Sequence, residues 1–287
     1  MNSINGNYCL ILGKISIMKT KYIIIPIFLL ILSSCKTEAP KEITIKEDVV
    51  FLADDALEGR QTGSDGELKA AKYISERYES IGLSPKRTDG YFQAFSFKPK
   101  TNPHQKVNFT VKDGDSIITG TNVVGFLDNK AENTIVIGAH YDHLGYGAEG
   151  SLYRGEKEIH NGADDNASGV SVLLNLANKL KAKNTKNNYL FITFSGEEMG
   201  LLGSNYFVKN ATIDLKNANY MINMDMVGRL KKDSTLAVYG TGTSPILKQT
   251  LNAHNSNFKL IQRESGVGPS DHTSFYNADI PVLHFFT

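Results

Sequence analysis

The sequence has few cysteines and no excess of charge of one sign. Its 287 residues include two Cys, 31 Lys and Arg, and 30 Asp and Glu, for a formal net charge of +1. Proteins that bind nucleic acid need a basic surface, and no long basic run occurs here, so we expect no nucleic-acid partner. A composition of 41% hydrophobic and 21% charged residues is typical of a globular protein with a sizeable core.

The scarcity of cysteine limits how the fold can be stabilised. The two cysteines are Cys9 and Cys35. A chain processed to begin at Cys35 would have no second thiol, so it could form no internal disulfide. Such a fold must depend on its hydrophobic core or on bound metal.

Long hydrophobic runs are also missing. Residues 22–32 form an apolar run that is too short to span a bilayer comfortably. Lys19 and Lys21 precede this run, and Leu-Ser-Ser and then Cys35 follow it, which resembles a bacterial lipoprotein signal peptide. The resemblance implies a signal peptide over residues 1–35 and lipid on Cys35. It also implies a place in the cell envelope outside the cytoplasm, facing the periplasm or on the outer membrane. A signal anchor that is never cleaved is the alternative. Met18 is the better start of the protein, so we interpret residues 1–17 as an extension that results from a wrongly assigned start.

The remainder of the chain divides into a tether and one folded domain. Residues 36–47 are polar and predict a tether, and residues 48–287 predict the domain. A helix over residues 65–81 is indicated by the S-x-x-E pattern from Ser64 to Glu67 and by Gly82 at its end. Its predicted apolar stripe consists of Leu68, Ala71, Ile74, Tyr78 and Ile81.

The later part of the domain alternates between strands and helices. A hairpin is expected around Asp113-Gly114. The predicted strands cover residues 123–127, 134–138, 189–194, 220–224, 236–239 and 282–286, and the predicted helices cover 168–181, 201–209 and 244–255. Apolar strands separated by helices favour an α/β fold with a mixed, largely parallel central sheet and helices on both faces.

Polar side chains gather where these strands end. They are His140 and Asp142, Glu197 and Glu198, and Asp225, with Asp164 and Asp165 at the start of the next helix. Each one alone has an ordinary explanation as a loop residue, a helix cap or a solvated turn. Together at one sheet edge the carboxylates would repel one another unless a cation lay between them. Histidine with carboxylates suits Zn²⁺ better than Ca²⁺ or Mg²⁺.

These residues lie in four ordered motifs. The motifs are "GAHYDHLG", "HNGADDNASG", "SGEEMGLLGS" and "NMDMVG", and similarity continues upstream to "LADDALEGRQTGSDGELKAA" and downstream to "PSDHTSFYNADIPVLHFFT". The chain resembles the M28 family of zinc aminopeptidases over about residues 48–287. The resemblance implies the α/β/α sandwich of zinc exopeptidases, with two Zn²⁺ per chain and peptides as substrates.

The resemblance also implies a role for each motif residue. It assigns one zinc to His140 and Asp225, the other zinc to Glu198, a bridging position to Asp165, the general base to Glu197, and orientation of the His140 ring to Asp142. In the implied mechanism a hydroxide shared by both zincs attacks the carbonyl, and Glu197 passes its proton to the leaving amine. Aspartate two residues after a ligating histidine suits the partner that fixes its tautomer.

We expect the remaining histidines not to be primary metal ligands. His143 and His160 read as loop residues, His272 as structural or as an indirect support of the metal site, and His284 as a core residue. The family pattern has a fifth ligand, a histidine after the last strand, and this sequence stops at "HFFT". The second zinc would then keep two protein ligands and be impaired. We expect a longer natural protein whose C-terminal part is missing here, with a natural short form as the alternative.

The leading prediction is therefore a lipid-anchored aminopeptidase that removes N-terminal residues from peptides. A glutaminyl cyclase with one zinc, which is a transferase, is the second possibility. A non-catalytic surface lipoprotein is the third, and only the absent fifth ligand supports it.

Overall fold

The computed structural model describes residues 44–99, 107, 109–147, 151–183 and 186–287. All of them belong to one compact unit, Glu42–Thr287. The predicted signal peptide, Cys35 and most of the tether lie outside the described residues. Among the described helices, none is long and apolar enough to cross a membrane.

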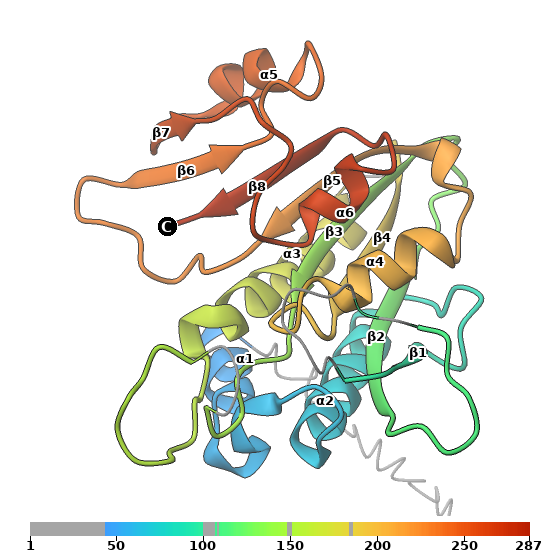
Figure 1. Ribbon diagram of the computed structural model, residues 1–287. Coiled ribbons are helices and arrows are strands. Elements are labelled where there is room, and N and C mark those ends of the chain that lie inside the picture. The colour runs from blue at the N-terminus through green and yellow to red at the C-terminus, as the bar shows by residue number, and fades with distance from the viewer. Residues whose placement is uncertain (1–43, 100–106, 108, 148–150, 184–185) are drawn as a thin grey trace, which may run out of the picture. The chain divides into compact units, whose positions relative to one another are not determined.

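Helices and strands alternate over most of the chain (Figure 1). The helices are α1 (Ile45–Leu52), α2 (Asp65–Ile81), α3 (Gly169–Lys183), α4 (Leu202–Lys209), α5 (Leu247–His254) and α6 (His272–Tyr276), with short helical turns at Asp55–Arg60, Ala163–Ser168 and Leu215–Asn217. The strands are β1 (Phe92–Phe97), β2 (Ile118–Leu127), β3 (Thr134–His140), β4 (Asn188–Phe194), β5 (Ala218–Met224), β6 (Thr235–Tyr239), β7 (Lys259–Gln262) and β8 (Val282–Phe286).

The strands form one eight-stranded sheet in the order β1-β2-β4-β3-β5-β8-β6-β7. The central strands β4, β3, β5 and β8 pair in parallel, as do β6 and β7. The pairs β1–β2, β2–β4 and β6–β8 are antiparallel. The prediction of a mixed sheet with a parallel centre is confirmed.

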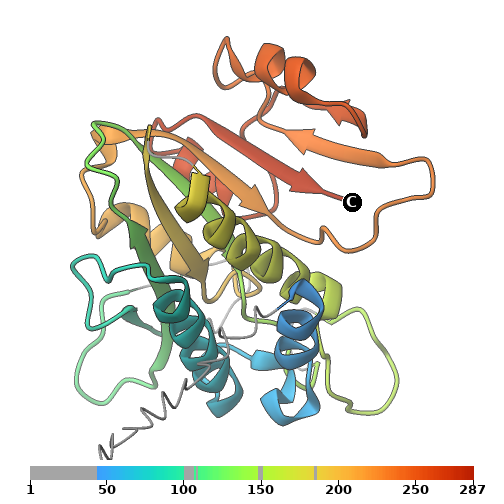
Figure 2. The same cartoon turned by 180° about the vertical axis from the view of Figure 1, so that it is seen from behind.

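Helices cover the two faces of this sheet (Figures 1 and 2). Successive strand side chains point to opposite faces, so Ile135 and Ile137 pack with α2 and α3, whereas Val136 packs with α4 and α6. Each face has its own apolar core, and the central strands are buried on both sides. Burial on both faces explains why these strands read as continuous apolar runs.

The predicted hairpin around Asp113-Gly114 is wrong, although a turn does occur there. The first half of β2 pairs with β1, for example Phe97 with Ile118, and β1 comes before the turn by more than a dozen residues. No described residue between 107 and 117 is in a strand. The turn therefore lies in the segment between β1 and β2 and does not join a hairpin.

The start of the domain and one stripe residue also differ from expectation. The first helix begins at Ile45, inside the predicted tether, because Thr44 and Glu47 form a reciprocal capping box. Helix α2 has the predicted cap at Ser64 and the predicted end at Gly82. Leu68, however, is 53% exposed, whereas the other four predicted stripe residues are buried.

This difference predicts unequal costs for two substitutions in the same helix. Ile74 is fully buried, so Ile74→Ala should lower the free energy of unfolding by about 2–5 kcal/mol. Leu68→Ala should change it by less than about 0.5 kcal/mol because no buried contact is lost. Urea unfolding monitored by circular dichroism measures both, and equal losses would contradict the packing of α2.

Candidate metal centre

Three parallel neighbours deliver the predicted site residues to one edge of the sheet. His140 is the last residue of β3, Glu197 and Glu198 follow β4, and Asp225 follows β5. Strand β3 lies between β4 and β5, and His140 is in register with Phe194 at the end of β4. The carboxyl ends of parallel strands are where such sheets collect ligands.

A fourth segment, Ala163–Ser168, reaches the same edge before α3 begins. The Asn166 side chain anchors it to the end of β5, because its Nδ2 donates to the Met224 carbonyl at 3.0 Å and its Oδ1 accepts from Met226 N at 3.2 Å. The Asp165–Asn166 peptide bond is cis. The two bonds of the Asn166 side chain hold the preceding Asp165 beside His140.

The first group of possible metal ligands is His140, Glu197 and Asp225. His140 Nε2 lies 3.3 Å from Asp225 Oδ1, 3.2 Å from Asp165 Oδ1 and 3.9 Å from Glu197 Oε2. The His140 ring is 1% exposed. Two atoms bound to one tetrahedral zinc lie about 3.3 Å apart, so the spacing around His140 fits that ion.

The second group is His143, Asp165 and Glu198. His143 Nδ1 lies 2.7 Å from Glu198 Oε1 and 3.9 Å from Asp165 Oδ2. The two oxygens of Asp165 thus face the two groups, one each. The prediction of His143 as an ordinary loop residue does not describe its position, because its ring is nearly buried and contacts Glu198. The only sequence signal for this position is that His143 is the second histidine of the "HYDH" motif.

Asp142 links two of the loops at this edge. Its Oδ1 accepts from Glu197 N at 3.1 Å, and its Oδ2 accepts from Glu198 N at 3.4 Å and from Thr62 Oγ1 at 3.0 Å. Towards His140 Nδ1 it presents its carbonyl oxygen at 3.2 Å and Oδ1 at 3.7 Å. Asp142 therefore orients the Glu197-Glu198 backbone as well as facing the His140 ring.

Burial and charge shift the pKa values of this cluster strongly. Burial lowers the pKa of His140, but the carboxylates of Glu197 and Asp225 outweigh it and raise the pKa well above 6.5. Burial raises the pKa of Glu197 well above 4.5. Burial also opposes ionisation of Asp225, yet the charge and hydrogen bond of His140 bring its pKa to about 2. In the metal-free protein the raised pKa keeps a proton on the His140 ring, and a metal ion would compete with that proton.

Two further histidines lie close to this edge without joining either group. His272 and His284 stack with ring centroids 4.3 Å apart and an interplanar angle of 5°. Burial lowers the pKa of His272 to about 3 and that of His284 to about 4, so both rings are neutral. His284 lies in β8 and is buried, as predicted. His160 lies in a loop, where its Nε2 is 3.3 Å from Ser151 Oγ.

Asp271 was not predicted from the sequence. Its side chain is fully buried, and burial raises its pKa to about 7. Only its position beside His272 in "SDHTSF" could have drawn attention to it.

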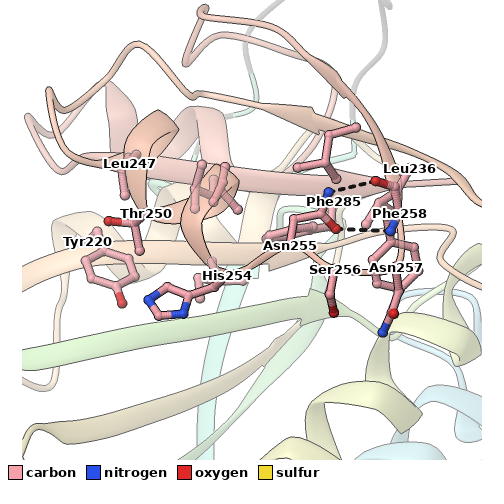
Figure 3. Close-up of a pocket in the computed structure, with 14 residues that line it drawn as sticks. Tyr220, Leu236, Leu247, Thr250, His254, Asn255, Ser256, Asn257, Phe258 and Phe285 are labelled. Atoms are coloured by element: carbon pink, nitrogen blue, oxygen red, sulfur yellow. Dashed lines mark hydrogen bonds between the residues drawn. The ribbon is translucent and has the colours of Figure 1, made fainter.

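A separate apolar pocket of about 340 Å³ lies between α5 and strands β5, β6 and β8. Its lining includes Tyr220, Leu247, His254 and Phe285 (Figure 3). Its lining residues include none from the two metal-ligand groups. The candidate centre is therefore defined by its polar cluster and not by this pocket.

The geometry of the cluster agrees with a comparison to known families. The model of peptidase family M28 matches residues 122–287. The chain belongs to this family. The match includes both groups of possible ligands, whereas α1, α2 and β1 precede it.

Curated members of the family are similar to part of the chain. A probable leucine aminopeptidase of Trichophyton verrucosum is 31% identical over 171 residues, which are 56% of this chain and 44% of that protein. Aminopeptidase YwaD of Bacillus subtilis is 30% identical over 175 residues, which are 58% of this chain and 35% of that protein. The chain thus spans less than half the length of these relatives.

Solved structures share the fold. A Zn-dependent exopeptidase from Parabacteroides distasonis superimposes with a TM-score of 0.61 at 18% identity, covering 87% of this chain and 86% of that one. A glutaminyl cyclase from Porphyromonas gingivalis gives a TM-score of 0.59 at 21% identity, covering 84% and 82%. At these identities the likeness shows the fold alone, which is that of the zinc exopeptidases.

Behind the site, Glu67 connects several elements through one buried carboxylate. Oε1 accepts from Tyr141 Oη, Thr121 N and Ser195 Oγ, and Oε2 accepts from Gly63 N. Burial raises its pKa from 4.5 to about 7. The S-x-x-E glutamate thus bonds across the fold and not back to the backbone of Ser64.

The raised pKa of Glu67 predicts a pH-dependent stability. A carboxyl whose pKa is higher in the folded state contributes most below pH 4.5, and this contribution is lost as pH rises through about 7. The side chain of Glu67→Gln cannot ionise. Between pH 4.5 and about 7, the free energy of unfolding of the wild type should therefore fall by roughly 2–3 kcal/mol more than that of Glu67→Gln. Urea unfolding of both metal-free proteins at several pH values measures the difference. Identical pH slopes would contradict the prediction, because the other site carboxylates are common to both proteins.

Proposed function

We propose that this protein is a zinc-dependent aminopeptidase that hydrolyses N-terminal residues from peptides. Family membership supports peptidase chemistry. The observation that carries the proposal is the pair of adjacent ligand groups at the ends of β3, β4 and β5, with Asp165 between them. Partly buried carboxylates this close need a cation to offset their repulsion.

The donor set fits two zinc ions. His140 and Asp225 would hold one, Glu198 would hold the other with His143 within reach, and Asp165 would contribute an oxygen to each. Mixed nitrogen and oxygen ligation is typical of zinc in hydrolases. When bound, zinc would lower the pKa of the attacking water and polarise the scissile carbonyl.

Glu197 is suited to move the proton in this reaction. Burial raises the pKa of its carboxyl, which favours uptake of a proton from water. Its backbone is fixed by the bond from its N–H to Asp142. In the proposed mechanism Glu197 takes the proton of the attacking water and delivers it to the leaving amine.

Replacing neighbouring glutamates separates catalysis from metal binding. Glu197→Gln should lower kcat on an aminoacyl-p-nitroanilide by at least about 100-fold while zinc content, measured by mass spectrometry, stays at the wild-type level. Glu198→Gln, the matched control, should lose zinc as well as activity. Full activity of Glu197→Gln would refute the assigned base, and a zinc-loaded wild type without turnover would favour a non-catalytic protein.

Glutaminyl cyclase chemistry is the second candidate, because a solved glutaminyl cyclase has the same fold. A cyclase would release ammonia from a peptide with N-terminal glutamine, and a peptidase would release free amino acids. Detection of ammonia without free glutamine would favour the cyclase. The presence of both ligand groups supports the peptidase.

We further propose that the enzyme is lipid-anchored in the cell envelope through Cys35. The support is the sequence before Cys35, with its basic, apolar and small-residue segments. Labelled palmitate should be incorporated into the wild type expressed in a bacterium and not into Cys35→Ser. Equal labelling of both proteins would exclude Cys35 as the lipid site.

A further inference from the structure

Arg60 is a buried cation that the peptidase mechanism does not use. It lies in the helical turn before α2, ahead of the residues that the family model matches. The residue is 1% exposed and is among the largest fully buried side chains. Among the described residues, no carboxylate lies within ion-pair distance of its guanidinium.

The guanidinium bonds instead to backbone carbonyls of two of the four segments that carry possible metal ligands. Nε donates to the Tyr141 carbonyl at 2.7 Å, between His140 and Asp142 in the chain. Nη1 donates to the Asn161 carbonyl at 2.7 Å, and Nη2 donates to the Gly162 carbonyl at 3.0 Å. Nη1 also bonds to the carbonyl of Leu52 at the end of α1. One planar group thus joins the β3 loop, the Asp165 loop and α1.

The backbone beside Arg60 strengthens this connection. Its carbonyl accepts from His143 N at 3.1 Å, and the Gly59 carbonyl accepts from Gly145 N at 3.0 Å. A Cβ at Gly59 would lie 2.5 Å from the Gly145 carbonyl oxygen, and a Cβ at Gly162 would lie 2.6 Å from Arg60 Nη2. Both glycines have positive φ. The backbone of Gly59 can approach Gly145, and the Arg60 guanidinium can approach Gly162, only because both positions are glycine.

The surrounding charge explains why an arginine is tolerated there. Burial lowers the pKa of Arg60 to about 10, and the charges of Asp142, Asp165 and Glu198 oppose this shift. A buried charge without a paired partner is costly, and nearby carboxylates offset part of the cost. The fork of N–H groups, which lysine lacks, allows bonds to several carbonyls at once.

We propose that Arg60 is a positioning residue of the metal centre, because its guanidinium sets the distance between the loop of His140 and His143 and the loop of Asp165. The inference rests on the proposed zinc site. It adds a residue from outside the matched region that prepares the site without touching metal or substrate. Loss of this connection should let the two loops separate and weaken zinc binding.

Arg60→Lys tests the proposal because it keeps the charge and loses the fork. We expect its zinc dissociation constant, measured by competition with a chromophoric chelator, to rise about 10- to 100-fold. Arg77→Lys is the matched control. Arg77 is also buried, but it pairs with Asp48 at 2.8 Å between α1 and α2. Arg77→Lys should lower the free energy of unfolding and leave zinc affinity unchanged.

Wild-type zinc affinity in Arg60→Lys would overturn the proposal, as would an equal loss of affinity in Arg77→Lys. A wild type that binds no zinc would instead refute the proposed function. If Arg60→Lys does not fold, Arg60→Met serves as the second variant, because it removes the buried charge together with all of its bonds at similar side-chain length. Arg60→Met should weaken zinc binding at least as much as Arg60→Lys, and unchanged affinity in this folded variant would overturn the proposal.

Discussion

Repulsion among closely spaced, partly buried carboxylates governs how this edge of the sheet is built. Asp142, Asp165, Glu197, Glu198 and Asp225 meet where three parallel strands end. Each would prefer water, and their proximity makes ionisation of all of them unfavourable. The fold counters this with a protonated imidazole, donated backbone N–H groups and a buried arginine, and the remaining deficit of positive charge is what two zinc ions would supply.

The N-terminal segment has a larger part in the site than its distance in sequence suggests. Arg60 and Glu67 are separated by a single turn, and both are buried behind the strand ends. Arg60 bonds to the carbonyls of the ligand loops, whereas Glu67 accepts from donors on β2 and after β3 and β4. Residues outside the matched region thus support the ligand loops of the family motifs.

The histidines of this chain show how environment separates identical side chains. His140 lies among carboxylates, which raise its pKa, and a metal ion bound there would displace the proton on its ring. His272 and His284 stack on each other, His284 contacts Asn223, and burial keeps both rings neutral. His143 is nearly buried, and its Nδ1 lies 2.7 Å from Glu198 Oε1. Spacing in the sequence alone does not distinguish them.

The elements that could be predicted from the sequence are those with local signals. The parallel strands are apolar because both faces are buried, and α2 begins at Ser64 and ends at Gly82 because caps act within one turn. The ligand motifs are recognisable because each is a short run next to a strand end. The helical spacing wrongly predicted that Leu68 is buried, because the exposure of a side chain depends on what packs against the helix.

The pairing of β1 with β2, the position of His143 and the contacts of Arg60 become visible only in the folded protein. Each depends on contacts between residues far apart in the chain, such as Arg60 with Tyr141 and Asn161. No local propensity encodes such contacts, because they arise only when the strands have paired and the loops have met.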